Sequence, residues 1–429
     1  MADGSDRVPM DSLTTHSEKI SSESPDGRQG PEARLAPAWM VQRLQAVGGA
    51  VPFRSFMEWA LHDPDHGAYG TGRLRVGPLG DFATSPSLGP AFADLLAPQL
   101  AEWLQALGPG PLALVETGPG EGDLARQLAA ALALGWPELA ARLELVLVEP
   151  NAGMAARQRQ MLAGAPLPVR WCDWPELAAR PLRGVMLAHE VLDALAVERL
   201  VWDGALWRQQ LVALTEAGDL VLAPGAPVAD WALAQLGALG LAQLEALDLA
   251  AAGLAAGPVP ARPPGWCSEL HPGLEPWLAA AAAGLAEGVL LVVDYALEAR
   301  RYYSLQRSSG TLMAYEGQQA SPDPLRQPGH WDLTAHLCLE SLEQAAAAAG
   351  WQELGQCRQG QALLALGLAG ALHGLQQPGG GDLAERLARR EALLRLVDPA
   401  GLGEFRWIAL GRGAAACAQT PRFLREPEG

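Results

Sequence analysis

The residues with the clearest chemical use in this sequence are acidic side chains around a glycine-rich turn. Glu116 precedes the turn, Glu121 lies within it and Asp123 follows it. A further acid, Glu149, ends the next apolar run along the chain. Glycine lets the backbone approach a ligand more closely than a Cβ would permit. The turn carries three of them, Gly118, Gly120 and Gly122.

The sign of these charges indicates which class of cofactor would bind. A dinucleotide places its pyrophosphate at the N-terminus of the helix that follows such a turn, and three carboxylates would repel it. S-adenosylmethionine has no phosphate, and its sulfonium and ammonium groups are attracted to carboxylates. Its ribose hydroxyls would donate hydrogen bonds to Glu149. The pattern therefore predicts S-adenosylmethionine as the cofactor. The alternative is an ordinary strand, turn and helix without a ligand.

The elements that must position these acids alternate between strand and helix. An apolar run precedes the turn, and leucines with helical spacing follow it over residues 124–134. Regular alternation predicts an α/β fold, a Rossmann-like parallel sheet that binds ligands at the carboxyl ends of its strands. We expect seven strands, near residues 112–115, 143–148, 167–171, 184–188, 288–293, 351–358 and 404–411.

Acids stand at the ends of the first four predicted strands. They are Glu116, Glu149, Asp173 and Glu190. Because the carboxyl ends of parallel strands meet at one edge, these side chains should converge there. Four carboxylates in one cleft repel one another, so stability alone does not explain them.

Glu190 and Asp193, which follow the fourth strand, are the candidate catalytic pair. Methyl transfer to a guanidinium needs groups that orient it and help to remove a proton, and carboxylates do both. In the alternative interpretation, one of the two binds the ammonium of the cofactor and the other caps a helix.

Composition excludes several other chemistries. The single lysine, Lys19, lies in a polar N-terminal segment, so neither a phosphate-loop lysine nor a Schiff-base lysine is available. The net charge of −17 argues against a nucleic-acid surface. The five cysteines lack zinc-site spacing. We interpret the loop 62–66, which has two histidines and two aspartates, as a structural turn, and we expect no metal.

The chain divides by composition into four parts. Residues 1–36 are polar and acidic, and we expect a disordered tail without a targeting signal, in a cytoplasmic protein without a membrane span. Residues 37–110 should form a helical lid. Residues 111–412 should form the catalytic domain, with a helical insertion at about 216–265, and residues 413–429 a C-terminal tail. Within the domain, Asp332 is expected to cap a helix that runs through Ala349, after a loop rich in arginine and tyrosine over residues 300–330.

Taken in order, several motifs resemble the MidA-like class I methyltransferases, which include a mitochondrial complex I assembly arginine methyltransferase. The matching stretches are FMEWALHDPDHGAYG (56–70), GDFATSP (80–86), VETGPGEGDL (115–124), HEVLDAL (189–195), VVDYA (292–296), GTLMAYEGQ (310–318) and DLTAHL (332–337). The resemblance implies a class I methyltransferase fold with a seven-stranded sheet, and methylation of an arginine in a protein substrate. It also implies that Gly80, Asp81 and His189 contact the cofactor. The family usually has asparagine where His189 stands.

Two other functions compete with this interpretation. One is a methyltransferase for a small molecule or lipid, and the other is an assembly chaperone that binds the cofactor with little catalysis. A nucleic-acid amino-methyltransferase is disfavoured, because HEVLDAL lacks the Asn/Asp-Pro-Pro-aromatic sequence that such enzymes usually carry. The sequence does not predict the identity of the substrate protein or the oligomeric state.

Overall fold

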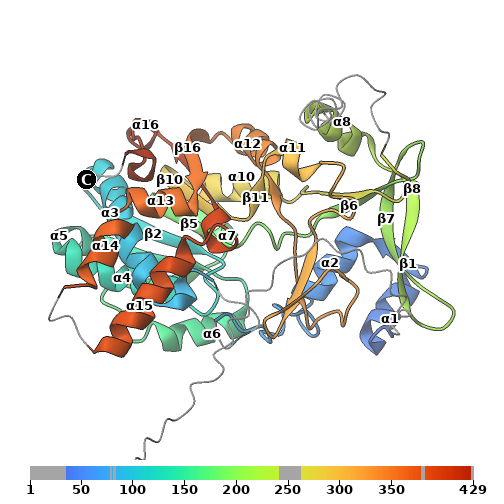
Figure 1. The fold of residues 1–429 in the computed structure, drawn as a ribbon, viewed down its shortest axis with the longest axis horizontal. Helices are drawn as coiled ribbons and strands as arrows, with labels where there is room; N and C mark the ends of the chain where they lie inside the picture. The colour runs from blue at the N-terminus through green and yellow to red at the C-terminus, as the bar shows by residue number, and fades with distance from the viewer. Residues whose placement is uncertain (1–34, 78–79, 81–83, 241–261, 378–381, 427–429) are drawn as a thin grey trace, which may run out of the picture. The chain divides into compact units, whose positions relative to one another are not determined.

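The computed structural model describes residues 35–77, 80, 84–240, 262–377 and 382–426. Its central element is a seven-stranded sheet with the strand order β16-β17-β10-β5-β2-β3-β4 (Figure 1). The last five strands of this order are parallel, and β17 runs antiparallel to both of its neighbours. The strands are β2 (Leu112–Thr117), β3 (Leu143–Val148), β4 (Val169–Cys172), β5 (Leu182–His189), β10 (Leu285–Asp294), β16 (Gln352–Arg358) and β17 (Arg406–Arg412). All seven predicted strands, and with them the α/β fold class, are confirmed.

Alternate residues of these strands face two hydrophobic cores, one on each side of the sheet. On β2, for example, Leu114 belongs to one core and Val115 to the other, and both side chains are fully buried. The first core is covered by α3 (Ala91–Ala106), α4 (Asp123–Gly135), α5 (Pro137–Ala140), α13 (Gln359–Ala365), α14 (Leu368–Gly374) and α15 (Leu383–Leu396). The second is covered by α7 (Trp174–Ala179), α10 (Leu274–Gly284) and α12 (Leu339–Ala348). A parallel sheet buried on both faces explains the continuous apolar runs in its strands.

A second group of strands lies on the side of the central sheet where its parallel strands have their carboxyl ends (Figure 1, right). Its main sheet contains β1 (Ala50–Pro52), β6 (Glu198–Trp202), β7 (Trp207–Leu214), β8 (Leu220–Pro227) and β9 (Cys267–Leu270). A three-stranded sheet contains β12 (Met313–Glu316), β13 (Gln319–Ser321) and β14 (Asp332–Thr334). Helices α1 (Ala38–Ala46) and α2 (Phe53–His62) share a third hydrophobic core with these strands. The N-terminal segment and two later segments of the chain thus fold together.

The structure corrects the predicted helix over residues 332–349. Residues Asp332–Thr334 form strand β14, which pairs with β12, and Leu337–Cys338 form β15, which pairs with β11 (Ala296–Leu297). The helix α12 begins only at Leu339. Pairing with strands from a distant part of the sequence outweighs the local cap signal at Asp332.

Three further segments differ in detail from the sequence interpretation. The insertion begins with strand β8 instead of a helix and continues into α8 (Asp230–Ala238), while residues 241–261 of the predicted insertion lie outside the described residues. The loop over residues 300–330 contains the end of α11 (Ala299–Tyr302), β12 and β13. In the C-terminal segment, α16 (Ala414–Cys417) is followed by Phe423, which is buried against Trp103 of α3.

The predicted disordered tail falls almost wholly on residues that the structure does not describe.

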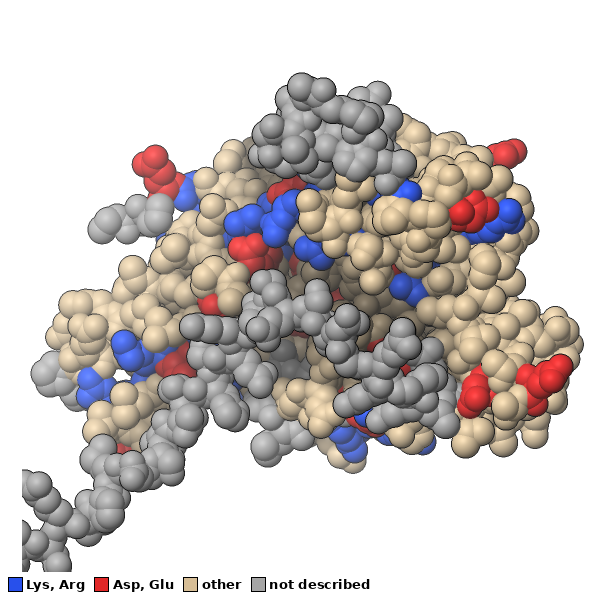
Figure 2. Space-filling view, turned by 45° about the vertical axis from the view of Figure 1, so that its right-hand side comes forward, with Lys and Arg blue, Asp and Glu red and all other residues tan. Residues whose placement is uncertain are grey.

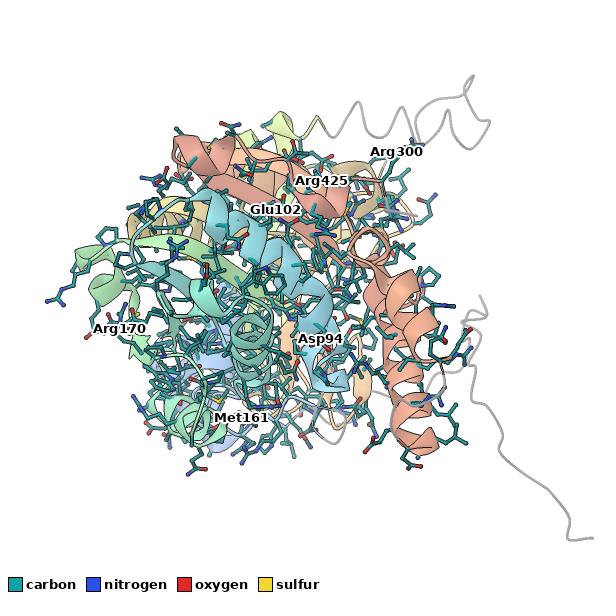
Figure 3. The ribbon with its side chains drawn as sticks, turned by 90° about the vertical axis from the view of Figure 1, so that its left-hand side faces the viewer. Asp94, Glu102, Met161, Arg170, Arg300 and Arg425 are labelled. Atoms are coloured by element: carbon teal, nitrogen blue, oxygen red, sulfur yellow. The ribbon has the colours of Figure 1, made fainter. Side chains whose placement is uncertain are left out.

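Figure 3 shows α3 across one face of the central sheet, with Asp94 and Glu102 on its outer side. Among the described residues, no helix is long and apolar enough to cross a membrane.

Candidate active site

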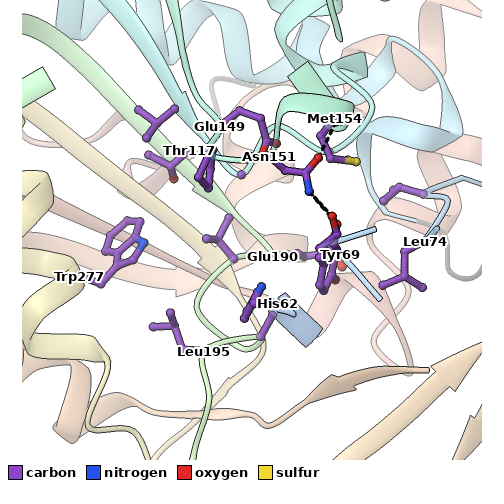
Figure 4. A pocket seen from close by; sticks show the side chains of 18 of the residues that line it. His62, Tyr69, Leu74, Thr117, Glu149, Asn151, Met154, Glu190, Leu195 and Trp277 are labelled. Atoms are coloured by element: carbon purple, nitrogen blue, oxygen red, sulfur yellow. Dashed lines mark hydrogen bonds between the residues drawn. The ribbon is translucent and has the colours of Figure 1, made fainter. Parts of the chain in front are cut away.

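A cavity of about 580 Å³ opens at the carboxyl ends of β2 and β3 (Figure 4). This volume lies within the range of pockets that hold drug-sized ligands. A neighbouring space of about 80 Å³ shares Tyr69, Val76, Gly118, Gly120 and Glu190 with it. The larger cavity is also lined by Thr117, Glu149, Asn151, Met154, Trp174 and Trp277, and the smaller one by Glu116, Asp123 and His189.

The glycine-rich turn forms one wall of both cavities. Gly118, Gly120 and Gly122 have positive φ angles of 57°, 52° and 91°, which glycine adopts at little cost. A Cβ at position 118 would lie 2.9 Å from Cγ2 of Val191, so the turn has no room for a side chain there. Gly118 and Gly120 line both cavities, whereas Gly122 lies at the N-terminus of α4. The backbone of the turn is therefore the surface offered to a ligand.

Glu116, at the end of β2, is buried in the wall of the smaller cavity. Its Oε2 atom has no hydrogen-bond partner. Burial, with repulsion from Asp123, raises the pKa of this carboxyl to about 8. A buried acceptor without a partner costs free energy unless a ligand supplies a donor. A cation or an N–H donor in this cavity would satisfy Glu116.

Glu149, after β3, is held in a fixed orientation at the wall of the larger cavity. Its Oε1 atom accepts from the backbone N–H of Asn151 at 2.8 Å, and its Oε2 atom from the amide of Gln158 at 2.9 Å. A carboxylate oxygen can accept more than one hydrogen bond, so both can still receive hydroxyl donors. Burial raises the pKa of Glu149, and the two hydrogen bonds oppose that shift.

Asn151 and Arg157 attach the N-terminal segment to this wall. Asn151 caps α6 (Ala152–Met161) with its Oδ1 atom and donates from Nδ2 to the carbonyl of Gly70 at 2.6 Å. Arg157 donates to the carbonyl of Gly72 at 2.9 Å. Figure 4 shows Tyr69 held beside Asn151 through these contacts. Residues 69–72 are therefore held against this wall of the cavity.

The charges around the turn are more balanced than the sequence suggested. Glu121 accepts from Arg157 at 3.0 Å and lies 3.5 Å from Arg75. Asp123 lies 3.6 Å from Arg126. Two of the three carboxylates thus have arginine partners, and Glu116 remains as the carboxylate that faces a cavity without one.

Asp173, Gly80 and Asp81 are not brought to either cavity by the described structure. Asp173 is exposed and caps α7, where it accepts from the backbone N–H of Glu176 at 2.8 Å. The carbonyl of Gly80 accepts from Gln318 at 2.9 Å. Asp81 lies outside the described residues.

His189 and Glu190 lie between the two cavities, at the end of β5. Glu190 lines both cavities, and its φ angle of 54° is unusual for a residue with a side chain. Its Oε1 atom has no hydrogen-bond partner, and the Nδ1 atom of His189 lies 3.4 Å away. Burial lowers the pKa of His189 to about 4, so the ring is neutral at pH 7. Left-handed backbone at such a position is frequent at functional sites.

Four carboxyl groups gather here, and we call them the carboxylate cluster: Glu190, Asp193, Asp294 and Asp332. Burial, with repulsion from Asp294 and Asp332, raises the pKa of Glu190 well above its usual value. Asp193 is shifted in the same direction by burial and by the other three. Among the described residues, no arginine or lysine forms an ion pair with Glu190 or Asp193. A bound cation would favour the charged forms of these acids and offset the repulsion between them.

Two members of the cluster were not predicted as site residues. Asp294, at the end of β10, accepts from the backbone N–H groups of Leu192 and Asp193 and so orients the segment after β5. Asp332 accepts from the hydroxyl of Tyr69 at 3.0 Å. Burial raises the pKa of three tyrosines, and carboxylates of the cluster add to each shift: Tyr69, Tyr295 and Tyr315. These three tyrosines therefore lie beside the carboxylate cluster.

The described residues contain no group of three histidine, cysteine or acidic side chains arranged to hold a metal ion. In the loop 62–66, Asp63 accepts from the backbone N–H groups of Asp65 and His66 and pairs with Arg43. These contacts give the loop the hydrogen bonds of a structural turn.

Comparison with known proteins identifies the family. A family model described as "Putative S-adenosyl-L-methionine-dependent methyltransferase" matches residues 95–357, more than half of the chain. The structure is similar to that of a COG1565 superfamily member from Burkholderia thailandensis bound to S-adenosyl-homocysteine, with a TM-score of 0.76 and 29% identity over 91% of this chain and 95% of that chain. A native structure of a COG1565 superfamily protein from the same organism gives a TM-score of 0.73 and 30% identity over 91% and 94%. No curated protein matches the chain.

The site agrees with these matches in two respects. The unpartnered oxygen of Glu116 faces a cavity, and the turn beside it has no space for a Cβ at Gly118. Both features fit a compact cationic cofactor that lies against bare backbone. The chain belongs to this family of class I S-adenosylmethionine-dependent methyltransferases, and S-adenosylmethionine is its methyl donor.

Proposed function

We propose that this protein transfers the methyl group of S-adenosylmethionine to a guanidinium nitrogen of an arginine in a protein substrate. The observation that carries the proposal is the carboxylate cluster beside the cofactor cavity. Glu190 and Asp193 are buried, burial and neighbouring acids raise their pKa values, and no described arginine or lysine pairs with them. A guanidinium from the substrate would supply the missing positive charge.

The chemistry of the cluster favours guanidinium over a lysine amine. A lysine amine must lose its proton before it can act as a nucleophile, and nearby carboxylates hold it in the charged form. A guanidinium stays charged at any ordinary pH and binds carboxylates through two parallel hydrogen bonds. Its planar face also stacks on aromatic rings. The three tyrosines beside the cluster, Tyr69, Tyr295 and Tyr315, suit that contact.

Glu190 and Asp193 would orient the guanidinium and accept its proton. When bound, S-adenosylmethionine supplies an electrophilic methyl group on a positively charged sulfur. The attacking nitrogen must lose one proton as its new bond to carbon forms. Glu190, whose pKa is raised well above its usual value, is a stronger base than an ordinary carboxylate once the guanidinium holds it in the charged form. Asp294 holds the backbone of this segment in place.

The cofactor would be held by the glycine turn and by two acids. Glu149, fixed by Asn151 and Gln158, would accept hydrogen bonds from the ribose hydroxyls. Glu116 would accept from the ammonium group through its unpartnered oxygen. Neutral His189, at the wall of the smaller cavity, would contact the cofactor without adding charge.

The sequence resemblance supports a wider role for this activity. Because the resembling family includes a methyltransferase for complex I assembly, we propose that the substrate belongs to a respiratory complex I-type assembly and that the reaction occurs in the cytoplasm. We also propose that residues 37–110 act as the lid and residues 111–412 as the catalytic domain. The contacts of Asn151 and Arg157 with residues 69–72 support the lid assignment.

A transfer assay tests the proposed function. The purified protein and S-adenosylmethionine with a tritiated methyl group are added to a lysate from cells that lack this protein. The proposal predicts a labelled protein band with the unchanged protein and a much weaker band with Glu190→Gln. Label confined to small molecules or lipid would contradict the proposal and support the competing methyltransferase function. Cofactor binding without any transfer would support the chaperone function.

A further inference from the structure

A group of arginines lies next to the carboxylate cluster, on the side of β10 and β17. We call these residues the arginine rim: Arg301, Arg307, Arg358 and Arg406. They come from α11, the loop after it, the end of β16 and the start of β17. Figure 2 shows basic and acidic side chains gathered together on the upper part of one face. In a chain with a net charge of −17, four neighbouring arginines whose ion pairs involve only the two carboxylates of Glu404 and Glu298 among the described residues call for an explanation.

Aromatic contacts connect the arginine rim to the carboxylate cluster. Tyr295, whose pKa is raised by burial and by Glu190, stacks on His336 with ring centroids 5.4 Å apart and an angle of 5° between the rings. Tyr295 also contacts Phe405, at 4.0 Å between ring centroids, and Phe405 precedes Arg406 in the sequence. Burial and the charges of Arg307 and Arg301 together lower the pKa of His336 to about 4. A neutral ring pair thus separates the negative cluster from the positive rim.

The arginine rim carries more positive charge than its own carboxylates balance. Glu404 serves two arginines, at 3.2 Å from Arg358 and 4.0 Å from Arg301. Glu298 pairs with Arg406. Arg307 is half-buried, and it has no ion pair with any carboxylate of the described residues. Burial and the charge of Arg301 lower the pKa of Arg307, and the nearby Tyr302 and Glu269 oppose this shift only in part.

The loop that carries Arg307 is held in place by buried groups. The carbonyl of Ser308 accepts from the backbone N–H of Cys267 at 2.8 Å. The carbonyl of Ser309 accepts from Arg199 at 3.0 Å, and the backbone N–H of Thr311 donates to buried Glu269 at 2.9 Å. The position of Arg307 beside His336 is therefore set by the fold. A fixed, partly buried arginine that makes no ion pair among the described residues is a suitable place for an anion.

We propose that the arginine rim binds an acidic side chain of the substrate protein, close in sequence to the arginine that enters the carboxylate cluster. The inference rests on the proposed function and adds a rule for substrate choice. One layer of stacked rings separates the two charged regions, so the acid should stand roughly two to four residues from the target arginine in an extended chain. Opposite charges on one short segment would then fix its direction and register in the site.

A peptide-selection experiment tests this inference. The probe is a degenerate library with one central arginine and random residues on both sides, presented to the full chain in complex with S-adenosyl-homocysteine. Retained peptides should be enriched in aspartate or glutamate over asparagine and glutamine by about three- to fivefold at one or two fixed positions. Arg307→Gln should abolish most of this enrichment, and Arg301→Gln should reduce it.

Arg170→Gln is the matched control. Arg170 pairs with Glu144 at the other end of the sheet order, and Figure 3 shows it on the side opposite to Arg300. This variant should keep the wild-type enrichment. Thermal unfolding of each variant verifies that it is folded. Equal retention of acidic and amide-bearing peptides, unchanged enrichment in Arg307→Gln, or no retention of any peptide would overturn the inference.

A second step separates this inference from the proposed function. The retained peptides are incubated with the protein and tritiated S-adenosylmethionine. Acid-selective binding without methylation of arginine would leave the role of the arginine rim standing and remove the proposed arginine specificity. Methylation of arginine without any preference for acids would support the proposed arginine specificity and contradict the role of the arginine rim.

Discussion

Glu190→Gln should separate catalysis from cofactor binding. Glu190 lies at the junction of the two cavities, with its backbone N–H bonded to the carbonyl of Val293 at 2.9 Å. Glutamine keeps the shape and one acceptor but removes the charge and the ability to take a proton. We expect turnover to fall by a factor on the order of a hundred, as for a positioned acid–base group. The affinity for the methyl donor should change by less than about threefold.

The same substitution should make the ligand-free protein more stable. In the folded chain, the charge of Glu190 is penalised by burial and by repulsion from Asp294 and Asp332. Glutamine removes both penalties without leaving a cavity. For a chain of this length, we expect the midpoint of thermal unfolding to rise by about 1–3 °C at pH 8. Lower activity together with higher stability would exclude misfolding as the cause of the lost turnover.

Single-turnover rates at saturating labelled donor, with calorimetric donor affinities, measure both effects. Asp193→Asn should behave like Glu190→Gln, and the double variant should be little worse than either if the two residues act as a unit. Glu144→Gln, which breaks an ion pair on the sheet between β3 and β4, is the control and should be near wild type. Normal turnover in Glu190→Gln would refute the orienting role. Weak donor binding with normal turnover at saturation would mean that Glu190 holds the ammonium of the donor.

Three further predictions concern the cofactor wall, pH and the tail. Glu149→Ala should weaken donor binding about ten- to a hundredfold in calorimetry, because charged hydrogen bonds to the ribose are lost; an unchanged dissociation constant would mean that Glu149 does not bind the donor. Burial raises the pKa of Glu116 to about 8 and that of Asp294 to about 7, whereas both acids lose their protons near pH 4 in the unfolded chain. The contribution of these two carboxyls to the free energy of unfolding is therefore fully present below about pH 4 and is lost as pH rises through 7 to 8. The midpoint of unfolding of the ligand-free protein should be lower at pH 8.5 than at pH 6, with a smaller difference in Glu116→Gln; an equal difference in both proteins would show that Glu116 is not responsible. Removal of residues 1–34 should leave donor affinity and melting temperature unchanged, and an insoluble product would contradict this.

The central sheet was predictable because its strands are buried on both faces. Such strands appear in the sequence as short continuous apolar runs, of which Leu143–Val148 is an example. The helix expected from Asp332 was wrong for the opposite reason. Its backbone pairs with Met313–Tyr315, and no local pattern shows which distant segment will supply a partner strand. Strand β8, in the insertion, was also missed, although its antiparallel partner β7 directly precedes it in the chain.

The site was predictable where it depends on strand ends. Glu116, Glu149 and Glu190 stand at the carboxyl ends of three strands of the parallel sheet and line the cavities, because these strand ends meet. Asp173 also follows a strand, but its side chain caps α7 and turns away from the cavities. Residue type and position alone do not distinguish a ligand-facing acid from a helix cap.

The position of Asp332 in the carboxylate cluster, and its contact with Tyr69, could not be predicted from the sequence. Their hydroxyl–carboxylate contact of 3.0 Å links the N-terminal segment to a strand more than two hundred residues later. Asp294 offered a better signal, because it directly follows a predicted apolar strand, as Glu116 and Glu149 do. An acid at a fifth strand end could have been added to the predicted set on the same argument.

The most direct test of the proposed arginine methylation is the chemical identity of the methylated residue. Protein labelled by the enzyme with tritiated S-adenosylmethionine is hydrolysed in acid, and the amino acids are separated by chromatography with methylated standards. If the carboxylate cluster binds a guanidinium, the label should elute with methylated arginine and should be strongly reduced in Glu190→Gln and Asp193→Asn. Label that elutes with methylated lysine or histidine, or that the hydrolysis releases as methanol from an esterified side chain, would contradict the guanidinium site.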